Sequence, residues 1–293
     1  MIPKIAHFIW FGTPPEWVNN VIREFTDLHP GWDVKLHTAI PASMPEAMRK
    51  RLLPCDQICQ WADILAVWLL FNEGGIYLDT DAIAIRNFEP LLNLEAFTSP
   101  HNDNDKRLTN GLMGSAKGSP AFAYLVDWIC KWDPPMRREK LAKRCYYGPD
   151  MLTEVFIQEK TPGMTVLPWH YFYPYTYDER GRAAECWRSD PSTRLALVDE
   201  LRSRFSDGVP PYAIHLWGVD GSSHKEASDV TQYFSSDQPI DPAGEARDRD
   251  LAAVADSGAV PGPADQRSRG RSQKGRAGVS AAAGRSAPAV APG

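Results

Sequence analysis

The chain contains 293 residues, of which 43% are hydrophobic and 24% are charged, with a formal net charge of −5. This length and hydrophobic content allow a substantial buried core, arranged as one large or two small domains. The acidic balance argues against nucleic acid as the main partner, and the longest apolar run is too short to span a bilayer.

The start of the chain and its cysteines both indicate a cytoplasmic protein. No basic-then-apolar leader opens the sequence, so we expect no secretory signal. The cysteines are odd in number and form no paired Cys-x-x-Cys units, so we expect reduced thiols. They are Cys55, Cys59, Cys130, Cys145 and Cys186.

The N-terminal segment predicts two strands separated by a helix. An apolar run over 2–12, closed by glycine and proline, predicts the first strand, and a proline pair precedes a helix over 16–28. Period-two alternation predicts the second strand over 31–37. Within the first strand, Trp10 taken alone is most simply a core residue.

A buried helix is predicted over 57–72. Its apolar residues recur at helical spacing, and the remaining positions are also largely apolar, so the helix should be interior. The pair Gly74-Gly75 ends it, since glycine adopts left-handed backbone easily. Asp63 lies inside this helix, and burying its carboxylate without a partner would be costly. It is either a structural ion pair or cap, or a site carboxylate that faces the same pocket as the acids downstream.

Two further carboxylates, Asp79 and Asp81, follow an apolar run that begins at Ile76. In an extended strand, residues two apart point to the same face, so these carboxylates should converge while Thr80 points away. Their repulsion must be offset, by a shared proton or by a hard divalent cation. The alternative is a turn at the end of a strand, where Asp is common.

The order of elements predicts the fold class. Strand, helix, strand, helix and strand up to Asp81 indicate an α/β fold with a mainly parallel central sheet flanked by helices. In such sheets ligands bind at the carboxyl ends of the strands, where Asp79 and Asp81 lie.

The last part of the chain differs in composition. From about Ile240 it consists mainly of Ala, Gly, Pro, Ser and Arg, which cannot bury enough apolar surface to order the chain. We therefore predict one domain over 1–239 and a disordered tail over 240–293. Six basic residues without an acid between 267 and 285 leave open a weak docking segment for an acidic partner or membrane surface.

Two stretches together resemble the central motif of the family-32 glycosyltransferases: Ala62-Asp63-Ile64-Leu65 and Gly74-Gly75-Ile76-Tyr77-Leu78-Asp79-Thr80-Asp81. That family includes the yeast outer-chain mannosyltransferase and bacterial capsule enzymes, and clostridial toxin glucosyltransferase domains are relatives. The resemblance implies a GT-A-like nucleotide-binding fold and a metal-dependent, retaining transferase. Such an enzyme would move a hexose from a UDP- or GDP-linked donor to a hydroxyl of a glycan or small molecule, with Mn²⁺ or Mg²⁺ as cofactor. We expect a bacterial enzyme.

The resemblance also implies roles for individual residues. Asp81 would bind the metal. Asp79 would contact a water molecule of the metal and the ribose. Asp63 would bind hydroxyl groups of the ribose or of the sugar. The opening stretch from Ile2 resembles the family's first strand, which would place Trp10 beside the nucleotide base.

Three later residues are candidates of the same kind. Asn110 would hydrogen-bond sugar hydroxyls or the metal's water shell, or it caps loop backbone. Asp150 is an N-terminal helix residue or faces the acceptor. His215 resembles the family's late histidine, which helps close the site over diphosphate and metal, and we expect it as a metal ligand together with Asp79 and Asp81. The alternative is a structural histidine at a strand end.

The chain departs from the family where an arginine usually follows the helix Asp by three residues, because this position is Ala66. Three explanations are open. Another cation takes the place of the arginine, the donor sugar differs from that of the family, or the enzymatic activity is weak. The available cations are Lys106, Arg107, Lys117 and Arg144.

Two other classes of protein remain open at this stage. An apolar run that ends in Asp-x-Asp also opens haloacid-dehalogenase-like phosphohydrolases, in which the first Asp is a nucleophile. The other class is a catalytically silent nucleotide-sugar-binding protein, which Ala66 would suit.

Overall fold

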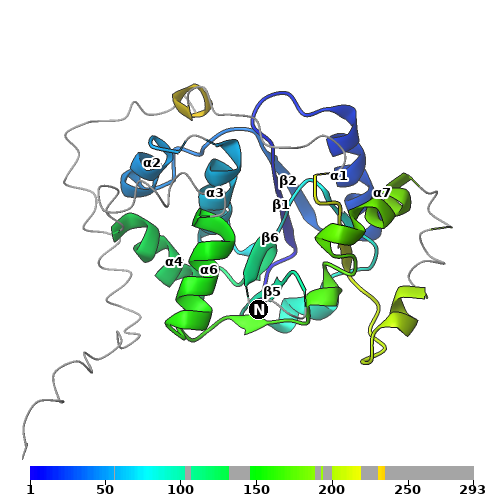
Figure 1. Ribbon diagram of the computed structural model, residues 1–293. Coiled ribbons are helices and arrows are strands. Elements are labelled where there is room, and N and C mark those ends of the chain that lie inside the picture. Colours follow the sequence, from blue (N-terminus) through cyan, green and yellow to red (C-terminus); the bar gives the residue numbers. More distant parts are fainter. Residues whose placement is uncertain are drawn as a thin grey trace, which may run out of the picture. The chain divides into compact units, whose positions relative to one another are not determined.

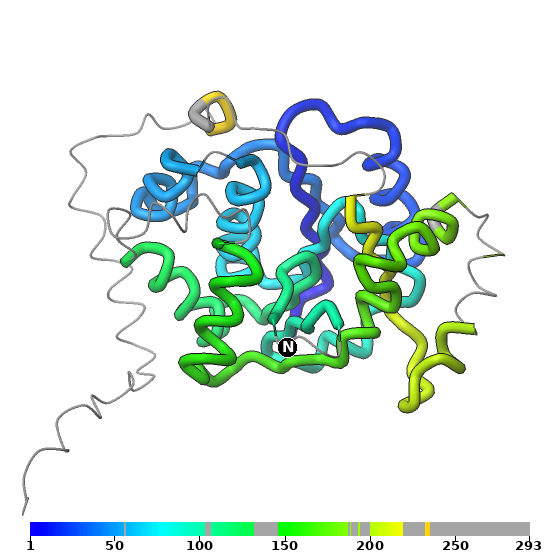
Figure 2. Tube along the Cα trace, in the orientation of Figure 1, coloured from blue at the N-terminus to red at the C-terminus, as the bar shows by residue number. Residues whose placement is uncertain are grey.

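The computed structural model describes most of the chain up to residue 234 (Figures 1 and 2): residues 1–55, 57–102, 107–131, 146–188, 193, 200–218 and 230–234. Its strands are β1 (Ile5–Ile9), β2 (Asp33–His37), β3 (Gly75–Leu78), β4 (Ala82–Ala84), β5 (Ala96–Pro100), β6 (Leu108–Ser115), β7 (Thr165–Val166) and β8 (Ala213–His215). Its α-helices are α1 (Glu16–Leu28), α2 (Glu46–Leu52), α3 (Ile58–Asn72), α4 (Pro120–Lys131), α6 (Met151–Thr153) and α7 (Arg180–Arg188).

Six of these strands form one central sheet, in the order β2-β1-β3-β6-β5-β7. The pairs β1–β2, β1–β3 and β5–β7 are parallel, whereas β6 runs antiparallel to both β3 and β5. A mixed α/β fold with a mainly parallel central sheet flanked by helices is therefore confirmed. The antiparallel strand β6 was not predicted, and it lies directly beside the strand that leads to Asp79.

Helices cover both faces of this sheet, and Figure 1 shows α3, α4 and α6 on one side of the strands and α1 on the other. Alternate residues of β3 point to opposite faces. Tyr77 packs into the core that contains α3 and α4, while Ile76 and Leu78 pack into the core that contains α1. This alternation is the ordinary pleat of a strand buried on both faces.

The helix α3 and its end match the prediction closely. It is buried nearly all round and stops before Gly74, whose φ is +73°. A Cβ on Gly74 would lie 2.6 Å from the backbone nitrogen of Lys117, and one on Gly75 would lie 2.6 Å from the carbonyl oxygen of Ile5. The ring nitrogen Nε2 of His7 bonds the Gly74 carbonyl at 2.8 Å. The glycine pair thus lets β3 enter the sheet tightly against β1.

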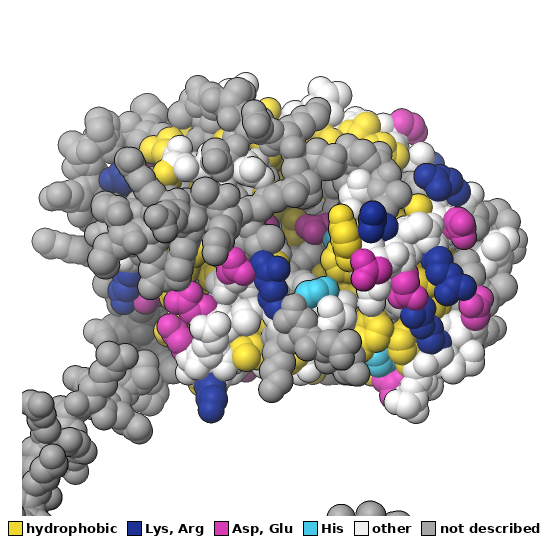
Figure 3. All heavy atoms as spheres, viewed as in Figure 1, with side chains coloured by type: hydrophobic (Ala, Val, Ile, Leu, Met, Phe, Trp, Pro, Cys, Tyr) yellow, Lys and Arg dark blue, Asp and Glu magenta, His cyan; other side chains and the backbone are white. Residues whose placement is uncertain are grey.

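Several predictions concern residues at or beyond the described ranges. The domain boundary at 239/240 and the tail over 240–293 lie outside them and remain predictions. No helix in the described ranges is both long and apolar enough to cross a membrane. The described cysteines form no disulfide with one another: Cys55, Cys59, Cys130 and Cys186. On the face seen in Figure 3, the described acidic and basic side chains lie interspersed.

Candidate functional site

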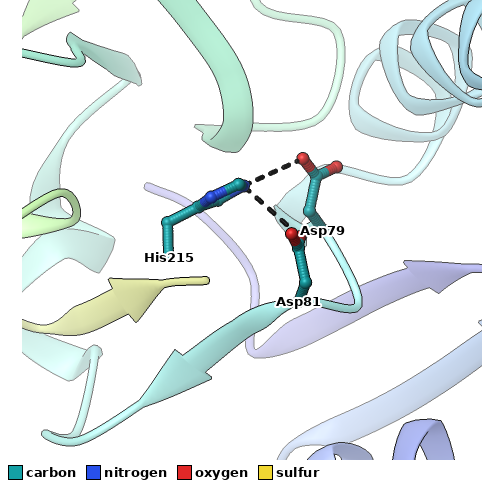
Figure 4. Close-up of side chains that lie close together, drawn as sticks. All are labelled: Asp79, Asp81 and His215. Carbon is teal, nitrogen blue, oxygen red and sulfur yellow. Dashed lines mark hydrogen bonds and ion pairs between the residues drawn. The ribbon is translucent and has the colours of Figure 1, made fainter. Parts of the chain in front are cut away.

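Asp79 and Asp81 lie in a tight turn between β3 and β4, and the amide of Ala82 closes it by donating to the Asp79 carbonyl at 2.9 Å. The prediction that both acids lie along one extended strand is therefore wrong, because β3 ends at Leu78. The turn still brings the two carboxylates together. His215 Nε2 is 3.3 Å from Asp79 Oδ2 and 3.4 Å from Asp81 Oδ1 (Figure 4).

The strand β8 places His215 at this turn. It pairs antiparallel with β4 in a register that sets His215 opposite Ala82, the residue after Asp81. One ligand atom each from Asp79, Asp81 and His215 lies within 4.8 Å of the others. Two carboxylates and one imidazole suit a hard or borderline divalent cation, so these residues could hold a divalent metal ion. We call these three residues the triad.

Backbone donors fix the orientation of the triad. The amide of Trp217 donates to His215 Nδ1 at 3.1 Å, and the amide of Gly218 donates to Asp81 Oδ2 at 2.8 Å. In a neutral imidazole whose Nδ1 accepts, Nε2 carries the hydrogen and donates to the carboxylates. Coordination of a metal through Nε2 would require that hydrogen to move to Nδ1.

Tyr77 holds the second oxygen of Asp79, since its hydroxyl donates to Asp79 Oδ1 at 2.6 Å. Burial first, and then the charge of Asp79, raises the pKa of the Tyr77 hydroxyl well above its usual range, so it stays a donor. Sequence reasoning did not select Tyr77. Its position two residues before Asp79 in the Gly-Gly-x-Tyr-x-Asp string was the available signal.

The helix carboxylate Asp63 faces the same pocket and bonds Asn110. The amide Nδ2 of Asn110 donates to Asp63 Oδ1 at 2.6 Å. Burial first, and then the charge of Asp79, raises the pKa of the Asp63 carboxyl well above its usual range, and the Asn110 bond only partly opposes this. Among the side chains that the structure describes, Asp63 therefore has an amide partner rather than the cation of a structural ion pair.

The variant Asp63→Asn should be more stable than the wild type at neutral pH. A folded-state pKa above the unfolded value means that stability falls as pH rises from about 4 through the folded pKa. Asn does not ionise, so the variant does not lose stability in this way. Its free energy of unfolding should exceed that of the wild type by on the order of 1 kcal/mol or more at pH 7.5, and this difference should shrink towards pH 4.5. Thermal unfolding of both proteins at several pH values measures it, and a gain that is independent of pH would contradict the expectation.

These acids line a cavity of about 650 Å³. Trp10 and Trp17 line it as well, with their ring centroids 5.4 Å apart and their planes at 88°. Trp10 is partly exposed, and its indole nitrogen donates to the Thr13 carbonyl at 3.2 Å. The structure thus places Trp10 in the wall of the cavity.

The described part of the cavity lining contains no Lys or Arg. Ala66 is fully buried in the core, and Lys117 is exposed and away from the cavity. Arg107 pairs with Asp150 at 2.8 Å, so Asp150 forms an ion pair outside the cavity lining. The other two candidate cations, Lys106 and Arg144, lie outside the described residues.

Gly111 and Gly148 lack side chains where side chains of the site pack closely against their backbone. A Cβ on Gly111 would lie 2.8 Å from Asp79 Oδ2 and 3.1 Å from His215 Nε2. A Cβ on Gly148 would lie 2.6 Å from Asn110 Oδ1 and 2.9 Å from Asp63 Oδ2. Sequence reasoning did not select either glycine, because nothing in the local pattern shows which distant side chains approach them.

Comparison with known proteins gives this site a context. Residues 15–98 match the family described as a glycosyltransferase sugar-binding region containing the DXD motif. Inositol phosphoceramide mannosyltransferase 3 of Schizosaccharomyces pombe is 32% identical over 142 residues, which cover 43% of this chain and 36% of that protein. The mannosyl phosphorylinositol ceramide synthase of Saccharomyces cerevisiae is 30% identical over 140 residues, covering 43% and 35%.

A third relative is the lactosylceramide 4-alpha-galactosyltransferase of Mus musculus, 28% identical over 180 residues that cover 57% of this chain and 43% of that protein. The match to the solved structure of the PaToxG glycosyltransferase covers 54% of this chain and 70% of that chain, at 18% sequence identity and a TM-score of 0.43. The chain spans less than half the length of each of these three curated relatives. All three are eukaryotic, so the expectation of a bacterial enzyme stays a prediction.

The matched region contains Asp63, Asp79 and Asp81, and the fold adds His215 from outside it. Neither of the two other classes of protein is favoured by these comparisons. Residues 15–98 of the chain are therefore similar to the DXD-containing sugar-binding region of glycosyltransferases.

Proposed function

We propose that the protein is a metal-dependent, retaining glycosyltransferase with a GT-A-like site. It moves a hexose from a nucleoside-diphosphate sugar to a hydroxyl of a glycan or small-molecule acceptor. The observation that carries this proposal is the convergence of Asp79, Asp81 and His215 within one cavity. The names of the relatives support mannose or galactose as the hexose.

The charge of the cavity explains why a cation would be needed. Its described lining contains the carboxylates Asp63, Asp79 and Asp81 and no Lys or Arg, so a diphosphate alone would be repelled. A divalent cation held by the triad would act as a Lewis acid and stabilise the departing nucleoside diphosphate. Tyr77 and the Gly218 amide keep the two triad carboxylates oriented for that purpose.

The remaining residues would hold the donor. Trp10 and Trp17 offer aromatic surface to the base, and the Asp63–Asn110 pair offers a carboxylate and an amide to hydroxyls of ribose or sugar. In this proposal the acids hold metal and donor, so none is assigned as a nucleophile. The leaving phosphate would then help to deprotonate the acceptor on the same face of the sugar.

Calorimetric titration with UDP and with GDP, each with and without Mn²⁺ or Mg²⁺, tests the donor site. We expect one nucleotide to bind only when the cation is present. Binding of neither nucleotide under any condition would overturn the proposal. Donor hydrolysis or transfer, measured with the sugar nucleotide of the base that binds, separates an enzyme from a silent binding protein.

We also propose a cytoplasmic location. The cysteine pattern of the sequence supports it, since the five cysteines are odd in number and form no paired Cys-x-x-Cys units.

A further inference from the structure

A second group of aromatic side chains, separate from Trp10 and Trp17, lines the cavity beside the triad. It consists of Tyr173, Tyr177 and Trp217. The Trp217 ring centroid lies 4.9 Å from that of His215, 5.4 Å from that of Tyr173 and 6.0 Å from that of Tyr177. The first two distances place Trp217 in contact range of the triad residue His215 and of Tyr173.

The backbone of Trp217 is held in an unfavourable conformation. Its φ is +59°, and Lys160 is the only other non-glycine residue with positive φ among the described residues. Its indole nitrogen donates to the Tyr175 carbonyl at 3.0 Å, and its amide donates to His215 Nδ1 at 3.1 Å. A conformation of this kind persists only where the surroundings fix it. The direction of the Trp217 ring is therefore set by the fold.

Tyr177 stands at the mouth of the cavity with 55% of its surface exposed. Tyr177 is the first residue of a short 3-10 helix, Tyr177–Glu179. A capping box between Thr176 and Glu179 fixes the start of this helix and therefore the position of the Tyr177 backbone. The guanidinium carbon of Arg180 lies 4.4 Å from the Tyr177 ring centroid. The ring plane makes an angle of 84° with that of Trp217, so the two rings form a corner, and both residues line the cavity.

The two aromatic groups approach the triad from different neighbours of β3. Trp10 follows β1, which pairs with β3 on one side. Tyr173 bonds Thr109 of β6, which pairs with β3 on the other side, at 2.9 Å. If the base packs on Trp10, the corner beside Tyr173 is left for the second substrate.

We propose that Tyr177 and Trp217 form a stacking platform for a sugar ring of the acceptor, an inference that rests on the proposed transferase function. Aromatic faces pack well against the C–H face of a pyranose, whereas an aliphatic alcohol has no such face to present. The acceptor class that this corner recognises is therefore a glycoside, and its hydroxyl is held beside the triad.

Binding of simple glycosides to the 293-residue chain tests the platform. The probes are methyl α-mannoside and methyl β-galactoside, compared with glycerol, observed by saturation-transfer NMR with and without Mg²⁺ and nucleotide. We expect a glycoside to bind better than glycerol and its affinity to fall about 5–10-fold in Tyr177→Ala. The matched variant Tyr177→Phe keeps the ring and should bind as the wild type does. Both variants should bind nucleotide normally.

Two results would overturn the platform: glycoside affinity that is unchanged in Tyr177→Ala, or glycosides that bind no better than glycerol. Either result, together with normal cation-dependent nucleotide binding, leaves the proposed transferase function intact. Loss of nucleotide binding in the wild type is a separate outcome that overturns the transferase function instead.

Discussion

Replacing Asp81 by Ala should abolish cation-dependent nucleotide binding. The side chain is buried, and its two oxygens face His215 Nε2 and the Gly218 amide. Its removal takes away one of the two carboxylates that would hold the cation and leaves the repulsive charge of Asp79 in the cavity. Changes in groups that only orient a metal ligand cost about 10–100-fold, so loss of a ligand itself should cost at least about 100-fold in affinity.

Calorimetry with the preferred nucleotide and Mn²⁺ measures this loss. Asp81→Asn keeps the size of the side chain and a hydrogen-bond acceptor for Gly218, so it isolates the charge. Asp178→Asn removes an exposed carboxylate outside the triad and should bind nucleotide as the wild type does. Nucleotide affinity in Asp81→Asn within about threefold of wild type would show that the carboxylate is not a metal ligand.

Gly111→Ala should inactivate the protein through one added methyl group. The new Cβ would lie 2.8 Å from Asp79 Oδ2, 3.0 Å from Tyr173 Oη and 3.1 Å from His215 Nε2. The strand cannot move away easily, because the Gly111 carbonyl accepts the Asp79 amide at 2.8 Å. The triad must therefore shift, and displacements approaching 1 Å in such sites cost about 100-fold in kcat/KM.

Donor hydrolysis or transfer, together with thermal unfolding, checks this prediction. Overpacking of this kind typically costs about 1–3 kcal/mol of stability, so the variant should still fold. Gly181→Ala is the matched control, since nothing lies within 4 Å of its added Cβ in α7. A Gly111→Ala variant with wild-type activity would show that the triad geometry is not needed for the reaction.

The cavity also shows how charge and stability oppose each other in this protein. Burial and the nearby charge of Asp79 make the ionised form of Asp63 unfavourable, and they raise the pKa of its carboxyl group for this reason. The predicted gain in stability of Asp63→Asn should therefore accompany weaker donor binding. Opposed effects of this kind are common where a site needs groups that the fold alone would reject.

The sequence by itself determined the local elements and the motif. The helix that ends before Gly74 was predictable because apolar spacing and the glycine pair are local signals, and α1 was predicted with its observed bounds. Asp63, Asp79 and Asp81 were predicted to face one pocket, and the structure places all three in the cavity lining. The reason given for Asp79 and Asp81 was wrong, since a turn rather than strand alternation brings them together.

Only the tertiary structure decided which distant residues complete the site. The resemblance had offered His215 as a candidate, but its contact with Asp79, 136 residues away, depends on the pairing of β8 with β4, and local periodicity does not encode strand partners or strand direction. For the same reason, the antiparallel strand β6 and the close approach of Gly111 to the triad could not be predicted. Hydrophobic spacing sets which face of an element is buried, whereas the identity of the neighbour across that face depends on how the whole chain packs.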